Sequence, residues 1–317
     1  MAADRLKEVL GGAIKKGVAV KVWSREGLVI STKLYYGYKG VSESGPNDQG
    51  LTRKHVIENT QASLGRLGLD YVDVIFCHRP DPHTPIEETV RAMNHVISKG
   101  WAFYWGASEW LPSQIYEACE IADRLNLIRP IVAMEQSQYN IFECSRVEYA
   151  FVDLYKKYKL GLTTWSPLAF GTLTGKYTAG TPEGSRFTTP MIKSGPFHDG
   201  FEERVKTADQ LKPIAAELGC SLPQMSTAWA VANEKKKVST VLIGASRTRY
   251  WHQVGSPKYN QVRTLLSSQL FVAYGTAAEL KREMFVCCLY FYSREASEVL
   301  PLYDAMLSAK LTSTPTY

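Results

Sequence analysis

Polar side chains stand at or just after six apolar segments of the sequence, and their types could bind or activate a small organic substrate. They are Lys33, His78, Ser108, Gln136, Ser166 and Ser246. A lysine ammonium and an imidazole can polarise a carbonyl oxygen, whereas hydroxyl and amide groups orient a polar ligand. Because α/β proteins build their sites at the carboxyl ends of parallel strands, the series predicts one concave site.

Considered alone, Lys33 could be a solvent-exposed lysine at the end of a strand, and His78 could be a histidine with no role in catalysis or binding. The position of Lys33 after an apolar strand indicates partial burial, where its ammonium would lower the pKa of a neighbouring acid. Near that charge, His78 is suited to donate a hydrogen bond to a substrate oxygen. The series as a whole favours the functional interpretation.

The segment SPLAFGTLTGKY, residues 166–177, combines glycines, hydroxyls and Lys176. This composition suits a phosphate group, although an ordinary glycine-rich turn has the same composition. Neither G-x-G-x-x-G nor G-x-x-x-x-G-K-[ST] occurs in the chain, so we do not expect a nucleotide to be held in the Rossmann or P-loop manner.

Apolar and β-branched segments that alternate with helical periodicity set the expected fold. Strands are predicted at residues 28–31, 71–77, 102–106, 130–134, 160–165 and 240–243, and helices at 4–16, 53–67, 86–99, 112–125, 147–158, 202–218 and 222–233. The alternation indicates parallel strands with helical crossovers, in either an open sheet or a closed barrel. Residues 178–199, rich in Gly, Pro, Ser and Thr, are expected to form a long surface loop.

The composition excludes several functional classes. The chain has 317 residues, 45% of them hydrophobic and 21% charged, which is typical of a folded globular protein. Its net charge of +6 is dispersed and does not indicate nucleic-acid binding. We find no apolar stretch of about 18 residues, no secretory signal and no metal-ligand spacing among the six cysteines. We therefore expect a cytoplasmic protein with no metal site, no nucleic-acid partner and no membrane insertion.

Five segments of the chain are similar to one enzyme family. They are VISTKLYYG, YVDVIFCHRPDPHTPIEETVRAMNHVISKGWAFYWGASEW, EQSQYN, TTWSPLAFGTLTGKY and LKPIAAELGCSLPQ. On these motifs the chain resembles the aldo-keto reductases, in particular the β subunits of voltage-gated potassium channels and their plant relatives. The resemblance implies a (β/α)8 barrel of the TIM type that binds NADPH and reduces aldehydes or ketones by hydride transfer.

The resemblance also implies roles for individual residues. Lys33 and His78 match the family's active-site lysine and histidine. The matches to cofactor-binding positions are Ser108 and Gln136 at the carboxamide, Trp165 beside the nicotinamide, Ser166, Pro167, Leu168, Gly171, Thr174 and Lys176 in the pyrophosphate loop, and Arg186 and Ser246 near the adenosine.

Two departures from the family pattern limit the expected activity. The family's first strand, first helix and second strand find no match, and the resemblance places the catalytic tyrosine and aspartate there. Tyr35 and Tyr36 match substrate-pocket positions instead. We therefore expect residues 1–262 to form an N-terminally incomplete barrel that is weakly active or inactive, less stable than complete relatives and prone to associate. Residues 263–317 form an unmatched tail, predicted to be helical.

Three functional hypotheses follow. The first is an NADPH-dependent reductase of small carbonyl substrates. The second is a non-enzymatic, cofactor-binding regulatory subunit that binds a potassium channel α subunit. The third is a truncated product without a function of its own. The resemblance also implies a homo-oligomer, since tetramers are known among the related β subunits.

Overall fold

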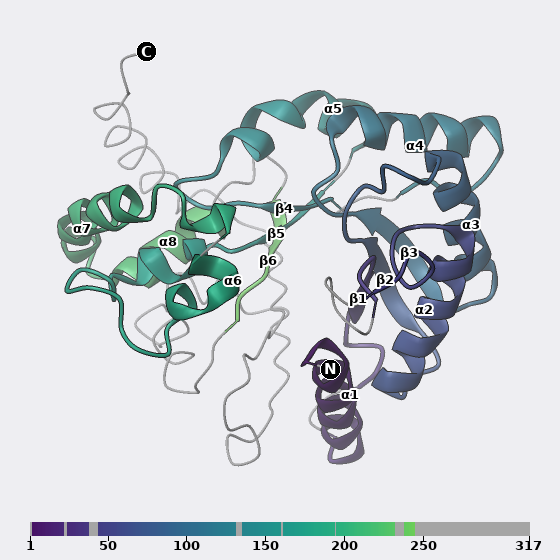
Figure 1. The fold of residues 1–317 in the computed structure, drawn as a ribbon, viewed down its shortest axis with the longest axis horizontal. Helices are drawn as coiled ribbons and strands as arrows, with labels where there is room; N and C mark the ends of the chain where they lie inside the picture. The colour runs from purple at the N-terminus through teal and green to yellow at the C-terminus, as the bar shows by residue number, and fades with distance from the viewer. Residues whose placement is uncertain are drawn as a thin grey trace. The chain divides into compact units, whose positions relative to one another are not determined.

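Six strands form one sheet in the order β1-β2-β3-β4-β5-β6 (Figure 1). The computed structural model describes residues 2–21, 24–37, 44–130, 135–159, 161–193, 195–231 and 238–244. The strands are β1 (Ser31–Leu34), β2 (Val72–Cys77), β3 (Ala102–Ala107), β4 (Glu135–Gln138), β5 (Leu162–Trp165) and β6 (Val238–Val241). The pairs from β1 to β4 are parallel, and helices connect consecutive strands. This arrangement is part of a (β/α)8 barrel, which confirms the predicted fold class.

The α-helices are α1 (Ala2–Ala19), α2 (Arg53–Leu67), α3 (Ile86–Ser98), α4 (Pro112–Arg124), α5 (Val152–Tyr158), α6 (Pro190–Lys193), α7 (Phe201–Glu217) and α8 (Leu222–Val231). A helix forms in each segment where periodicity predicted one, and α6 forms where none was predicted. The prediction of one helix over residues 147–158 is wrong, because a π-helical turn, η1 (Arg146–Ala150), precedes α5. Phe151 separates the two with φ −95° and ψ 0°, outside ideal helical geometry.

Two of the predicted strands begin too early in the chain. β1 begins at Ser31, which pairs with Val74 on β2. The N–H of the preceding Ile30 donates to the Asp73 carboxylate at 2.7 Å, and its carbonyl oxygen accepts from the Asp73 N–H at 2.8 Å. Lys33 therefore lies inside β1 rather than after it. Gln136 likewise lies inside β4, whereas residues 131–134, where that strand was predicted, are outside the described residues.

The chain divides into two compact units, which are described separately. Among the described residues, the first unit contains those up to residue 137 together with 148–163, and the second contains 138–147 and 164–244. In the first unit, β2 and β3 lie at the centre of the core. Trp105 on β3 is fully buried, and its indole N–H donates to the carbonyl oxygen of Ile128 at 3.0 Å.

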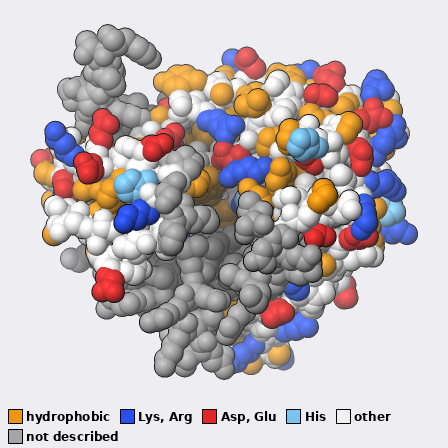
Figure 2. Space-filling view, in the orientation of Figure 1, with side chains coloured by type: hydrophobic (Ala, Val, Ile, Leu, Met, Phe, Trp, Pro, Cys, Tyr) orange, Lys and Arg blue, Asp and Glu red, His pale blue; other side chains and the backbone are white. Residues whose placement is uncertain are grey.

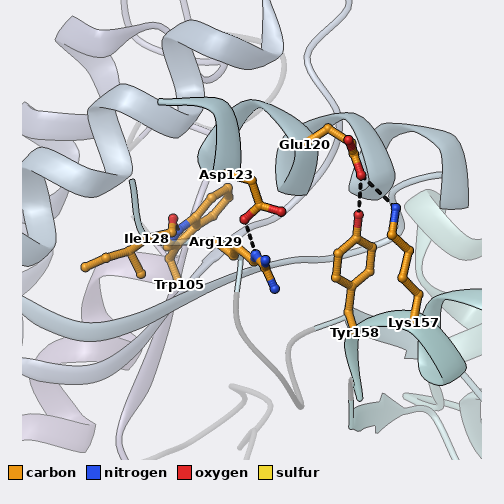
Figure 3. A network of polar contacts seen from close by, with 7 residues as sticks. All are labelled: Trp105, Glu120, Asp123, Ile128, Arg129, Lys157 and Tyr158. Atoms are coloured by element: carbon orange, nitrogen blue, oxygen red, sulfur yellow. Dashed lines mark hydrogen bonds and ion pairs between the residues drawn. The ribbon is translucent and has the colours of Figure 1, made fainter. Parts of the chain in front are cut away.

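A polar network joins α4 to α5 on the surface of the first unit (Figure 3). The Glu120 carboxylate accepts hydrogen bonds from Lys157 at 2.7 Å and from Tyr158 at 2.9 Å, and Arg129 pairs with Asp123. Exposed ion pairs of this kind contribute little to stability, because water screens the charges. The buried contacts, and not this network, hold the helices on the sheet.

In the second unit, an aromatic cluster organises the segment after residue 177. Its members are Tyr177, Phe187 and Ile192, with Phe170, Phe197, Phe201 and Val205 packed against them. The expectation of an irregular loop at 178–199 is therefore only partly correct. The short helices η3 (Arg186–Thr188), α6 and η4 (Pro196–His198) form there, since the apolar side chains fold the segment back on α7.

Charged side chains of both signs are interspersed on the described part of the face drawn in Figure 2. None of the described helices is long and apolar enough to cross a membrane. Within the same described ranges, no group of three or more His, Cys, Asp or Glu residues is arranged to hold a metal ion.

Helix α1 packs on α2 at a point where only glycine fits. A Cβ atom added to Gly11 would overlap the backbone of Leu67, the last residue of α2, whereas a Cβ at the neighbouring Gly12 would meet nothing within 4 Å. Gly11 is buried and Gly12 is exposed. Of these two adjacent residues of α1, Gly11 therefore has no room for a side chain, whereas Gly12 has open space around it.

We predict that alanine at these positions changes stability in opposite directions. Gly11→Ala forces α1 away from α2 and should lower the free energy of unfolding by about 1–3 kcal/mol. Gly12→Ala should raise it by about 0.5–1 kcal/mol, because alanine is the better helix former. Urea unfolding of both variants measures this difference. Equal effects of the two substitutions would contradict the close packing of α1 on α2.

Candidate functional site

Hydrogen bonds between neighbouring strand ends bring the candidate residues of the first unit together. The His78 N–H donates to the Leu34 carbonyl oxygen, and the Ser108 N–H donates to the Cys77 carbonyl oxygen, both at 2.9 Å. The Ser108 hydroxyl donates to the carbonyl oxygen of Gln136 at 3.0 Å. These bonds link the carboxyl ends of β1, β2 and β3 to one another and to Gln136 in β4.

The His78 imidazole is neutral at physiological pH. Burial, followed by the nearby positive charges of Lys33 and Arg79, lowers the pKa of His78 from 6.5 to about 3. A neutral imidazole retains one N–H group, so His78 can donate a hydrogen bond to a substrate oxygen without carrying charge. The sequence analysis assigned the same task to this residue.

One tyrosine ring lies next to His78, and a second packs on the first. The ring centroids of Tyr36 and His78 are 5.3 Å apart with an edge-on geometry, and those of Tyr35 and Tyr36 are 5.0 Å apart. Burial, followed by the charge of Asp81, raises the pKa of Tyr35 above its ordinary value, so that Tyr35 stays protonated. Tyr36 therefore places an aromatic ring beside the imidazole.

A buried acceptor lies within β4. The Gln136 side chain is 1% exposed, and its Oε1 accepts no hydrogen bond from the described part of the chain. Burying an acceptor without a hydrogen bond lowers the stability of the folded state unless a ligand or water supplies a donor. Behind it, the Glu135 carboxylate accepts hydrogen bonds from the Glu109 N–H at 2.6 Å and the Ser137 hydroxyl at 3.1 Å.

In the second unit, the loop after β5 has an unusual backbone. Ser166, Ala169 and Phe170 have φ angles of +60°, +46° and +57°, which non-glycine residues rarely adopt, and Gly171 has a φ angle of +99°. The Phe170 N–H donates to the Ser166 hydroxyl at 3.2 Å, which closes the first turn of the loop. The helix η2 (Ala169–Thr174) therefore contains a kink at these residues.

Two basic side chains lie along this loop. The Lys176 Nζ atom would be 3.2 Å from a Cβ at Gly171, so glycine there leaves room for the ammonium. The Arg186 guanidinium lies over the Phe170 ring, 5.9 Å from its centroid, and burial lowers the pKa of Arg186 below its ordinary value. Arginine stays charged in proteins despite such shifts. The loop thus carries two positive charges suited to an anionic ligand.

The structure groups the predicted site residues by unit. The first unit contains Lys33, His78, Ser108 and Gln136, and the second contains Trp165, Ser166, Pro167, Leu168, Gly171, Thr174, Lys176 and Arg186. Ser246, the remaining predicted position, is outside the described residues.

Sequence reasoning missed three residues that hold the candidate site in place. The Asp81 carboxylate accepts hydrogen bonds from Leu51 N–H and Thr84 Oγ1, both at 2.7 Å, and so fixes the segment after β1. Glu135 and Asn140 hold the turns after β3 and β5. Their signal in the sequence is weak, because short polar residues after strands also occur in ordinary turns.

We predict that His78 makes stability depend on pH. Its pKa is about 3 in the folded chain and 6.5 ordinarily, so the folded state binds fewer protons between these values. Stability should be complete above pH 6.5 and fall as the pH falls from 6.5 toward 3, by up to about 1 kcal/mol per pH unit. His78→Asn should flatten this dependence in urea unfolding, whereas His83→Asn, which changes an exposed histidine, should not. An unchanged slope in His78→Asn would contradict the prediction.

Comparisons with known proteins agree with this arrangement. The Aldo/keto reductase family profile matches residues 6–255. A probable voltage-gated potassium channel subunit beta of Arabidopsis thaliana is 51% identical over 247 residues, which cover 78% of this chain and 71% of the relative. A protein of the same description from Oryza sativa subsp. japonica is 49% identical over 247 residues, with the same shares covered. The chain therefore belongs to the aldo/keto reductase family.

Proposed function

We propose that this chain binds NADPH and reduces small aldehydes or ketones by hydride transfer. The observation that carries the proposal is the buried Gln136 Oε1 within β4, which accepts no hydrogen bond from the described residues. β4 is two strands along the sheet from β2, which the neutral imidazole of His78 follows. A carboxamide NH2 group supplies the donor that this acceptor needs. Membership of an oxidoreductase family supports the same conclusion.

Each unit, taken by itself, has residues suited to one part of a nicotinamide dinucleotide. In the first unit, Gln136 and Ser108 would hold the carboxamide. In the second, the left-handed loop from Ser166 to Lys176 would hold the pyrophosphate, with Arg186 toward the adenosine end. Trp165 and the other loop positions, Pro167, Leu168, Gly171 and Thr174, belong to the same proposal, as does Ser246. When bound, NADPH supplies the hydride.

Lys33 and His78 act on the substrate carbonyl. His78 donates a hydrogen bond to the carbonyl oxygen, and the Lys33 ammonium stabilises the negative charge that develops there. Because the imidazole is neutral and strongly resists protonation, His78 is a poor source of the proton that completes an alcohol. We therefore propose that turnover of the 317-residue chain is weak, as the unmatched catalytic tyrosine and aspartate suggested.

The second candidate is a regulatory subunit that binds the cofactor without turning over substrate. The observation that favours it is the description of both curated relatives as probable potassium channel beta subunits. In this role the chain would bind a channel α subunit, and the cofactor would act as a structural or redox-sensing ligand. A cytoplasmic location and a homo-oligomeric state are proposed for either function, with residues 1–262 as the family domain and 263–317 as a separate tail.

We predict that Lys33→Met abolishes carbonyl reduction but retains the cofactor. The test is NADPH oxidation with 4-nitrobenzaldehyde, in which kcat/KM should fall by about a hundredfold or more, because the charge that stabilises the carbonyl oxygen is removed. NADPH affinity, measured by quenching of tryptophan fluorescence, should stay within about twofold. Lys99→Met, which removes an exposed lysine after α3, is the matched control.

The outcomes distinguish the two candidates. Turnover that disappears in Lys33→Met but persists in Lys99→Met supports the reductase. Saturable NADPH binding with no turnover in the unsubstituted chain supports the regulatory subunit. Absence of NADPH binding would overturn both.

A further inference from the structure

The carbonyl group of Ser166 fixes the start of the loop after β5. Its oxygen accepts two hydrogen bonds, one from the Ala169 N–H at 2.9 Å and one from the Asn140 side-chain amide at 3.1 Å. The first bond belongs to the turn itself. The second comes from another segment, the chain just after β4, and therefore ties the loop to the sheet.

Asn140 is held rigidly in the orientation that makes this contact. It is fully buried, and its Oδ1 accepts hydrogen bonds from the N–H groups of Phe142 at 3.0 Å and Glu143 at 3.1 Å. Because backbone N–H groups can only donate, Oδ1 must face them and Nδ2 must face Ser166. The neighbouring bond from the Tyr139 N–H to the Trp165 carbonyl at 3.1 Å aligns the two segments.

The conformation that follows Ser166 depends on the direction of its carbonyl. Ser166 itself has a φ angle of +60°, and left-handed Ala169, Phe170 and Gly171 follow it. Non-glycine residues keep such angles only where their surroundings enforce them. The hydrogen bond from Asn140 holds the Ser166 carbonyl from outside the loop. The bonds from the Ala169 and Phe170 N–H groups to Ser166 lie within the loop.

We propose that Asn140 is a positioning residue that sets the conformation of the loop from Ser166 to Lys176 and thereby its affinity for the cofactor pyrophosphate. The part that concerns affinity rests on the proposed function. The part that concerns the loop does not, because it follows from hydrogen bonds of the chain alone. Asn140 touches no reacting atom in this proposal and acts through the Ser166 carbonyl.

Asn140→Asp isolates this contact. The substitution keeps an oxygen for the Phe142 and Glu143 N–H groups but replaces the donor that faces Ser166 with a second acceptor. Asn140→Ala removes all three bonds. Asn126→Asp is the matched control, because it makes the same chemical change at an exposed asparagine with a left-handed φ angle of +52° in the first unit.

The first readout is hydrogen exchange of the cofactor-free protein. Asn140→Asp should speed exchange at Ala169, Phe170 and Gly171 by about tenfold or more, the loss expected for one hydrogen bond opposed by a repulsive oxygen pair. The Phe142 N–H, which bonds to the Asn140 side chain, should remain protected in Asn140→Asp and lose protection in Asn140→Ala. Amides of β2 should exchange as before in every variant.

The second readout is the dissociation constant for NADPH, measured by tryptophan fluorescence at 15 °C, well below the unfolding transition. Asn140→Asp should raise it about tenfold, and Asn126→Asp should leave it unchanged. A role confined to general stability would lower the thermal midpoint without changing this constant. Should Asn140→Asp fail to fold, Asn140→Ala, which introduces no charge, gives the same two readouts.

The outcomes keep this proposal separate from the proposed function. Loop amides that exchange at the unsubstituted rate in Asn140→Asp would overturn the positioning role, even if NADPH binds. If the unsubstituted chain binds no NADPH, the proposed function fails, and hydrogen exchange alone decides whether Asn140 holds the loop. Faster loop exchange with an unchanged dissociation constant would overturn the link between loop and affinity.

Discussion

The candidate site depends on turns that a polypeptide does not adopt readily. Glu109 follows Ser108 with a φ angle of +62°, and Ser166 has a φ angle of +60°. Each such residue costs on the order of 1 kcal/mol or more and persists only where its surroundings compensate. Here the compensation comes from β4 and the residues after it, since Glu135 bonds to the Glu109 N–H and Asn140 bonds to the Ser166 carbonyl.

The two units carry different chemistry around these turns. In the first, the Gln136 amide, the Ser108 hydroxyl and the neutral His78 imidazole offer uncharged hydrogen-bonding groups. In the second, Lys176 and Arg186 offer positive charge. A dinucleotide has the same division, because its carboxamide is neutral and its phosphates are anionic. The match supports the proposed ligand from charge alone, independently of the family comparison.

Much of this arrangement was predictable from the sequence. The alternation of strands and helices followed from periodicity, and the polar residues at strand ends followed from the rule that α/β sites form there. Local sequence patterns did not predict features that depend on contacts between distant residues. The Ile30 N–H binds the Asp73 side chain on another strand, and the segment 178–199 is helical in part because Phe187 packs in an aromatic cluster. The role of Asn140 was hidden for the same reason, since its partner Ser166 lies on the next strand end.

The central proposal is that the loop after β5, held by Asn140, binds the pyrophosphate of NADPH. It is tested most directly by hydrogen exchange of the unsubstituted chain across a titration with NADPH. The proposal predicts that amides at residues 168–175 become protected as NADPH binds. Unchanged exchange of these amides at saturating NADPH would contradict it.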